Sequence, residues 1–178
     1  LEEIHGIDVY NPRNKSFLDQ PEIQIALYAM ARCMDPGLEY GRSCYGSVPS
    51  KLDEWETTFE DTISNPGDSA ISNYIAEWEE TIRAEDGGEN LGSTPLELYL
   101  ELITFDPLSE WISDDPARAK RLGQLSDVLD SFLRTTSMRY LQTSTRDNTN
   151  RVATRLLGDF YYVLLSYLNS VDLDDPED

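Results

Sequence analysis

The sequence predicts an all-α protein, an irregular helical bundle, and three observations lead to that prediction. Apolar residues recur every three or four positions through most of residues 21–170, which is the spacing of one helix face. Turn signals such as Asp35-Pro36-Gly37 and Asn65-Pro66-Gly67 separate these stretches. Only one short strand-like run, around Ile7 and Val9, is visible, and a strand without a partner leaves its backbone groups unpaired. That run is therefore either a loop or part of a sheet in an adjoining domain.

The first half of the chain predicts three helices. Asp19 and Glu22 have the spacing of a capping box, so a helix is expected to follow them and to end at Asp35-Pro36-Gly37. Residues 38–47, with two glycines, are expected to form a loop, and further helices are expected over 49–64 and 69–83. The expected core-facing residues of the three helices are Ile23, Leu27, Met30 and Met34; Leu52, Trp55, Phe59 and Ile63; and Ile71, Tyr74, Ile75, Trp78 and Ile82.

The second half predicts four more helices. Thr94, Pro95 and Glu97 suit the start of one helix, a short helix is expected to end near Trp111, and Asp115-Pro116 begins another. The last helix is expected over residues 145–169, at the centre of the bundle, because its lower half is apolar nearly all round. The expected inward residues are Leu96, Tyr99, Leu100 and Ile103; Leu122, Leu125, Leu129, Phe132 and Leu133; and Val152, Leu156, Phe160, Leu164 and Tyr167.

Composition narrows the possible functions. The chain has 34 Asp and Glu against 14 Lys and Arg, a formal net charge of −20. Such a surface is typical of a highly solvated protein or a high-salt cell interior, and it is a poor partner for phosphate backbones. Two cysteines do not predict a zinc site or a disulfide scaffold. No apolar run has the length of a membrane span, so no membrane partner is expected. The expected location is the cytoplasm.

The sequence predicts no catalytic residue, no cofactor site and no metal site. It contains no Gly-rich loop of the kind that holds nucleotide phosphates, and His5 is its single histidine. Adjacent carboxylates such as Glu79-Glu80 point in different directions on a helix and do not converge. Trp55, Trp78 and Trp111 lie at core spacing, so we interpret them as packing anchors, with a stacking platform as the alternative.

One segment has the opposite charge. Residues 118–155 contain eight cations and three aspartates, a net charge of +5. Arginine binds phosphate through its forked donors, so a phosphate-facing stripe is one explanation, and internal ion pairs with the acidic helices are the other. Under the first explanation the candidate DNA contacts are Arg139, Arg146, Arg151 and Arg155.

Two stretches carry a resemblance to a known family. The first runs from Gly6-Ile7 through Phe17 and Glu22-Ile23 to Asp35-Pro36. The second runs from Leu96-Glu97-Leu98-Tyr99 through Phe105-Asp106-Pro107-Leu108 to Lys120-Arg121-Leu122-Gly123-Gln124-Leu125. Together they resemble the 2B accessory region of the UvrD/PcrA/Rep-type superfamily 1 DNA helicases.

The resemblance implies a domain division and a set of partners. Residues 1–20 would be a stub of the adjoining RecA-like 2A domain, 21–170 the helical 2B-like domain, and 171–178 an acidic tail or linker. The chain would be a piece of an ATP-dependent DNA helicase that moves 3′ to 5′ on single strands, and the parent would use ATP and Mg²⁺. Its partners would be DNA, through the parent helicase, and the helicase's own motor domains.

The sequence also departs from that family. The Gly-Ile-Gly element by which several members touch duplex DNA is absent, and Gly41–Pro49 occupies its place. The ATP-binding loop of the family lies outside 2B and is not expected in these residues, so the chain alone should not hydrolyse ATP. The alternative function is an acidic helical protein–protein interaction module or a DNA mimic without a motor.

Overall fold

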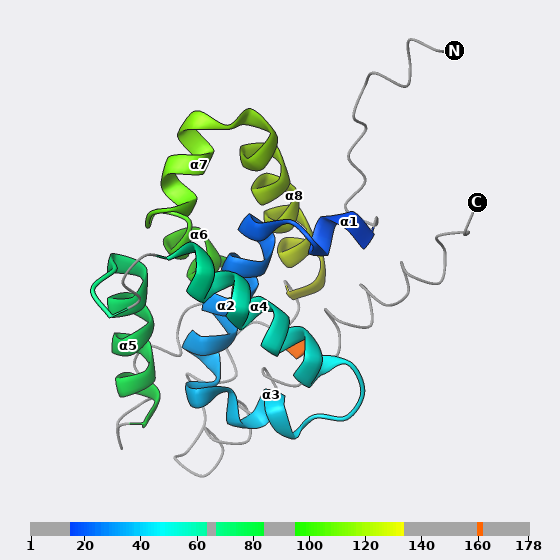
Figure 1. Cartoon of the computed structure of the whole chain (residues 1–178), viewed down its shortest axis with the longest axis vertical. Helices are drawn as coiled ribbons and strands as arrows, with labels where there is room; N and C mark the ends of the chain where they lie inside the picture. Colours follow the sequence, from blue (N-terminus) through cyan, green and yellow to red (C-terminus); the bar gives the residue numbers. More distant parts are fainter. Residues whose placement is uncertain (1–14, 64–66, 84–94, 134–159, 162–178) are drawn as a thin grey trace, which may run out of the picture.

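The computed structural model describes residues 15–63, 67–83, 95–133 and 160–161, and these residues form helices and turns without a strand (Figure 1). The prediction of an all-α fold is therefore confirmed for this part of the chain. The strand-like run near Ile7, the loop over 84–92 and, apart from two residues, the helix expected over 145–169 lie outside the described ranges. The elements are α1 (Lys15–Leu18), α2 (Pro21–Met34), the 3-10 turn η2 (Pro36–Leu38), α3 (Glu39–Ser43), α4 (Val48–Thr62), α5 (Ala70–Arg83), α6 (Pro95–Leu102), α7 (Leu108–Asp114) and α8 (Pro116–Leu133).

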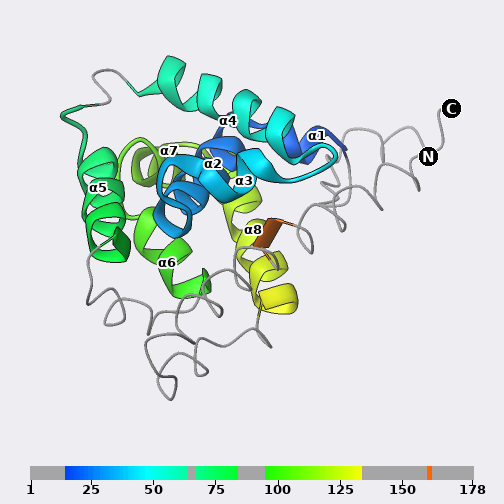
Figure 2. The same cartoon turned by 90° about the horizontal axis from the view of Figure 1, so that it is seen from below.

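Helix α2 is the centre of the described bundle. It packs against α4, α5, α6 and α8, and Figures 1 and 2 show these helices arranged around it. Twelve of its 14 side chains are buried, on every side of the helix. A helix that buries all its faces must be apolar nearly all round, and the sequence IALYAMA within α2 meets that requirement.

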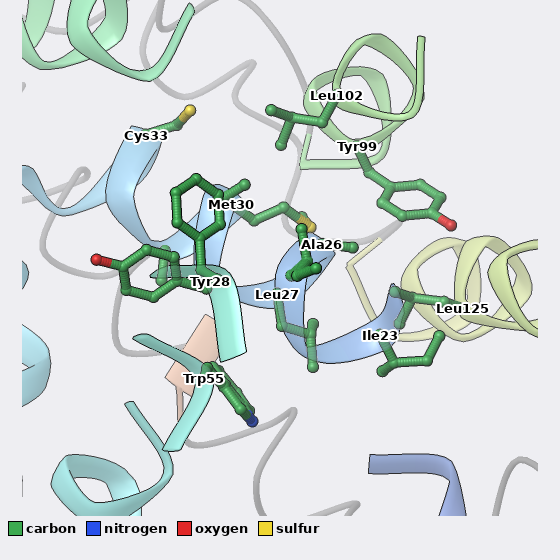
Figure 3. Packing of buried hydrophobic residues seen from close by; sticks show 14 of the residues in the cluster. Ile23, Ala26, Leu27, Tyr28, Met30, Cys33, Trp55, Tyr99, Leu102 and Leu125 are labelled. Atoms are coloured by element: carbon green, nitrogen blue, oxygen red, sulfur yellow. The ribbon is translucent and has the colours of Figure 1, made fainter. Parts of the chain in front are cut away.

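The apolar faces predicted for the first three helices are largely confirmed. Leu52, Trp55, Phe59 and Ile63 of the α4 region are all buried. On α5, Ile71, Ile75 and Trp78 are buried, while Tyr74 packs against the core from its edge. Figure 3 shows side chains from α4, α6 and α8 converging on Leu27, Met30 and their neighbours in α2.

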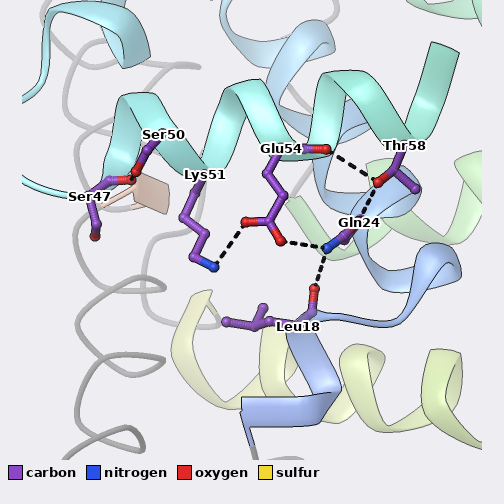
Figure 4. A network of polar contacts seen from close by, with 7 residues as sticks. All are labelled: Leu18, Gln24, Ser47, Ser50, Lys51, Glu54 and Thr58. Atoms are coloured by element: carbon purple, nitrogen blue, oxygen red, sulfur yellow. Dashed lines mark hydrogen bonds and ion pairs between the residues drawn. The ribbon is translucent and has the colours of Figure 1, made fainter. Parts of the chain in front are cut away.

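A polar network that is only partly buried joins α1, α2 and α4 (Figure 4). The buried Gln24 amide donates to the Leu18 carbonyl at 2.9 Å and to Oε1 of Glu54 at 3.3 Å. Thr58 donates to the amide oxygen of Gln24. Because buried polar groups cost free energy when unpaired, these bonds fix how α4 lies across α2. Phe17 and Leu18 of α1, within the predicted 1–20 stub, are buried in the same core.

The capping-box prediction is wrong. The residue that precedes α2 is Gln20, which makes no side-chain cap hydrogen bond, and Pro21 takes a first-turn position. Glu22 is fully buried and pairs with arginines of α8 instead of reaching back to the backbone. At the other predicted start, Asp115 does cap α8, because its Oδ1 accepts from the N–H groups of Ala117 at 3.0 Å and Arg118 at 3.3 Å.

Three further predictions need correction. Residues 38–47 contain the short helix α3, whose first N–H groups are bound by the carboxylate of Asp35. In α6 the buried face consists of Leu98, Tyr99 and Leu102, whereas Leu100 is 45% exposed. Both α6 patterns have helical spacing, and contact with α2 and α8 selects the one that includes Leu98. Helix α7 also continues past Trp111 to Asp114.

Candidate functional site

The four candidate DNA contacts, Arg139, Arg146, Arg151 and Arg155, lie outside the described residues. Their role stays a prediction. The first part of the same basic stretch lies on α8 and is described. There the structure shows the ion-pair partners of Arg118 and Arg121.

Two of the α8 arginines turn toward the interior. Nε of Arg121 donates to Oε1 of Glu22, across 99 positions of the chain. Nε of Arg118 lies 3.9 Å from Oε2 of Glu22 and 3.6 Å from Oδ2 of Asp115. The guanidinium of Arg118 also lies 4.1 Å from the centre of the Trp111 ring, which is a cation–π contact.

This pairing explains how a fully buried carboxylate is tolerated. A buried charge without a partner costs roughly several kcal/mol, and the ion pair with Arg121 offsets part of that cost. Oε2 of Glu22 accepts no hydrogen bond from the described residues. The two arginines therefore contribute to the fold: both lie beside Glu22 of α2, and Arg118 also lies beside Asp115. Lys120, between them on α8, has an exposed side chain.

A second buried carboxylate organises the end of α2. Asp35 is 3% exposed, and it accepts three hydrogen bonds. Its Oδ1 accepts from Tyr40 N at 3.1 Å, and its Oδ2 accepts from Gly41 N and from the Tyr161 hydroxyl, both at 2.8 Å. Burial, together with the nearby Asp35 carboxylate, raises the pKa of the Tyr161 phenol, so this hydroxyl stays protonated and remains a donor.

The loop between α3 and α4 occupies the place where the resemblance would put a duplex-contacting element. Tyr45 is 90% exposed at its tip, and Gly46 has a φ of 81°, in the left-handed region that favours glycine. The nearby Arg42 is paired with Glu56 at 2.8 Å. The loop therefore offers one solvent-facing aromatic ring and a cation that already has a partner.

The outer faces of α4 and α5 carry mostly negative charge. Exposed carboxylates line both helices and the turn before α5: Asp53, Glu54, Glu60, Asp61, Asp68, Glu77 and Glu80. Such a face repels the phosphates of a nucleic acid and attracts cations. Of the cations on these helices, Lys51 pairs with Glu54 at 3.1 Å and Arg83 is exposed.

A cleft opens beside this acidic face, between α2, α4 and α5. It encloses about 260 Å³ and is lined by side chains of all three helices. Tyr28, Phe59 and Ile75 form apolar walls, and Arg32, Glu60 and Glu79 supply charge. Arg32 is one of the lining residues, with Nε 2.8 Å from Oε1 of Glu79 and Nη1 donating to the Tyr28 hydroxyl at 2.9 Å.

The described residues do not assemble a catalytic constellation. Within them, no three or more His, Cys, Asp or Glu side chains gather in a way that would hold a metal ion. Burial raises the pKa of the Cys33 thiol, so it is not an activated nucleophile. Trp55 and Trp78 are buried, as expected for packing anchors, and Trp111 is covered on one face by Arg118. In the same ranges, no helix combines the length and apolar character needed to cross a membrane.

Comparison with known proteins gave no relative: no protein family matches the chain, and no curated protein or solved structure was found to be similar to it.

The sequence reasoning missed both buried carboxylates. The local sequence favours a cap for Glu22 and a helix end for Asp35. In the structure Glu22 binds Arg121, 99 positions away, and Asp35 binds Tyr161, 126 positions away. A local signal did exist for Asp35, because an aspartate that precedes a short helical segment often binds its N–H groups. The long-range partners had no local signal.

Proposed function

We propose that this chain is the 2B-like accessory part of an ATP-dependent DNA helicase of the UvrD/Rep type. In this proposal it helps the parent engage DNA and regulates unwinding, while ATP and Mg²⁺ act in motor domains outside it. The proposal also implies a cytoplasmic location, where such a helicase works on DNA. The motor domains are then its permanent partners.

One observation supports this proposal more than any other. The two stretches that carry the family resemblance lie far apart in sequence, and their described parts pack together: α2, from the first stretch, contacts α6 and α8, from the second. Glu22, in the first stretch, pairs with Arg121, in the second, and both side chains are largely withdrawn from solvent. The Tyr99 hydroxyl donates to the Leu122 carbonyl, which ties α6 to α8 within the second stretch.

The described helices also suggest how such a domain would face DNA. Phosphates are repelled by the exposed carboxylates of α4 and α5, so these helices would point away from the nucleic acid. Any DNA contact would then come from the basic stretch that begins on α8. The candidates there are Arg139, Arg146, Arg151 and Arg155.

The coding sequence on both sides of this chain tests the assignment directly. A helicase parent requires a phosphate-binding loop upstream and a Gly-Glu-type helicase motif downstream. A reading frame that encodes both supports the proposal. A reading frame without a phosphate-binding loop would contradict it.

The acidic face favours a second candidate, a protein-interaction or DNA-mimic module without a motor. Its exposed carboxylates carry the same sign of charge as a run of phosphates. The two candidates differ in binding: a helicase domain binds DNA with an affinity that falls as salt rises, and a mimic binds a basic protein and competes with DNA for it. Titration of the chain with labelled DNA, and with a basic DNA-binding protein held on DNA, separates them.

A further inference from the structure

The cleft between α2, α4 and α5 has the composition of a site for a cation. One arginine and two glutamates line it, which gives a net charge of −1. The positive charge is already in use, because Nε and Nη2 of Arg32 lie 2.8 and 2.7 Å from Oε1 of Glu79. An incoming anion would therefore meet a neutralised arginine and an additional glutamate.

Glu60 supplies a negative charge that no cation of the described residues neutralises. Its side chain is exposed at the rim of the cleft, and within the part of the chain that the structure describes no cation pairs with it. Asn73, on the α5 side of the cleft, adds an exposed amide with one acceptor oxygen. A cation that enters the cleft can thus be bound from both walls.

The apolar walls suit the flat, weakly hydrated head group of arginine or the methylene stem of lysine. Tyr28 and Phe59 form a tilted aromatic pair with ring centres 4.9 Å apart. The cleft already holds one guanidinium in this way, since Arg32 lies 5.8 Å from the centre of the Tyr28 ring. The volume of about 260 Å³ is below the ~300 Å³ at which pockets for drug-sized molecules begin, so one side chain is a better fit than a cofactor.

We propose that this cleft binds a single basic side chain, arginine or lysine, from a partner protein. Exposed carboxylates beside it, including Asp61, Glu77 and Glu80, would attract a basic segment and raise its association rate. The cleft is negatively charged, whereas residues 118–155 are positively charged, so this site is distinct from the candidate DNA contacts. The proposal holds under either of the two proposed functions.

The test is a titration of the ¹⁵N-labelled chain with the peptide acetyl-Gly-Ser-Gly-Arg-Gly-Ser-Gly-amide, followed by NMR. Saturable shifts are expected at the amides of Gly67, Asn73 and Ala76, which line the cleft. The same peptide with citrulline, the neutral isostere of arginine, should give none. Glu60→Gln should weaken binding by about fivefold, as expected for one exposed ion pair.

Two further variants separate the cleft from general acidity. Glu110→Gln removes the same charge from an exposed position on α7 and should leave the affinity unchanged. Ala76→Leu fills part of the cleft without a change of charge and should abolish the shifts at Gly67 and Asn73. Melting temperatures of all three variants should match the wild type, because all three positions are exposed.

Several results would overturn the proposal. Shifts spread over all acidic helices, an equal effect of E60Q and E110Q, or equal binding of the citrulline peptide would each show non-specific attraction. No saturable shift at millimolar peptide would mean that the cleft has no free site, for example because other cations of this chain occupy it. Any of these outcomes is incompatible with a dedicated site for a partner's side chain.

Discussion

The hydroxyl of Tyr161 donates a 2.8 Å hydrogen bond to Oδ2 of Asp35, 126 positions earlier in the chain. Both residues are buried, and the Tyr161 ring also stacks on Tyr40 with ring centres 6.1 Å apart. One carboxylate therefore holds the start of α3 and a residue from the C-terminal part of the chain together at the end of α2.

Removing this hydroxyl should destabilise the protein. Tyr161→Phe leaves the ring in place and deprives the buried Asp35 carboxylate of one of its three donors. We expect the free energy of unfolding to fall by about 1–3 kcal/mol, measured by urea denaturation. Tyr45→Phe, at a side chain that is 90% exposed, is the matched control and should change nothing. Equal stability of the two variants would show that the Asp35 contact contributes little.

Gly41 lies where a side chain has no room. A Cβ at this position would be 2.5 Å from Cδ1 of Leu52 and 2.9 Å from the Tyr161 hydroxyl. Gly41→Ala should therefore lower the free energy of unfolding by about 1–3 kcal/mol, the usual cost of overpacking. Gly123→Ala is the control, since its added Cβ on α8 has no atom within 4 Å apart from the neighbouring backbone of its own helix. There alanine should stabilise the helix by up to about 1 kcal/mol, and an equal change in both variants would contradict the crowding seen at Gly41.

Glu22 should be essential to the contact between α2 and α8. Glu22→Gln keeps the shape of the side chain and leaves Arg118 and Arg121 without their buried anion. Breaking a buried pair in this way typically costs about 3–5 kcal/mol, which thermal or urea denaturation detects readily. Asp19→Asn removes one charge from an exposed position close by in sequence and should cost far less. A loss of equal size at both positions would favour a general charge effect over the specific pair.

The sequence predicts the fold correctly where a helix buries a single apolar face. Ile23, Leu27 and Met30 repeat at helical spacing, and burial of that face follows from the spacing alone. The apolar run IALYAMA also permits burial of the other faces of α2, but the sequence does not show which helices cover them, because that depends on tertiary contacts. The α6 register failed for a similar reason: two apolar stripes compete there, and tertiary contact selects the one with Leu98.

The polar side chains were the least predictable part. Glu22 has the local sequence of a capping residue, yet the ion pair with Arg121 takes it into the core. Its partner lies on another helix, and local pattern contains no information about it. The same holds for the α2–α4–α5 cleft, which brings Arg32 and Glu79 together across 47 positions.

The basic stretch predicts that the chain binds DNA and that substituting its arginines weakens this binding while the melting temperature stays the same. Arg151 and Arg155 are four positions apart and share one face of the expected helix, with Arg146 near its start. Changing all three to Gln should weaken binding to every DNA sequence alike and reduce the salt slope by about one per lost phosphate contact. Fluorescence anisotropy at several salt concentrations measures both quantities.

Lys120→Gln is the control for that experiment, because Lys120 is an exposed cation on α8 outside the candidate set. If the three arginines instead pair with the acidic helices, the triple variant loses thermal stability and its DNA affinity does not change. An undetectable affinity of the wild-type chain at low salt would exclude the DNA role of these arginines.

The most direct test of the helicase assignment is ATP hydrolysis by the product of the complete reading frame, measured with and without single-stranded DNA. If the assignment is correct, the complete protein hydrolyses ATP, single-stranded DNA stimulates this hydrolysis, and the protein unwinds a duplex that has a 3′ single-stranded tail. The present chain alone should show no turnover, since its sequence contains no phosphate-binding loop. A complete protein that hydrolyses no ATP in the presence of DNA would contradict the helicase assignment.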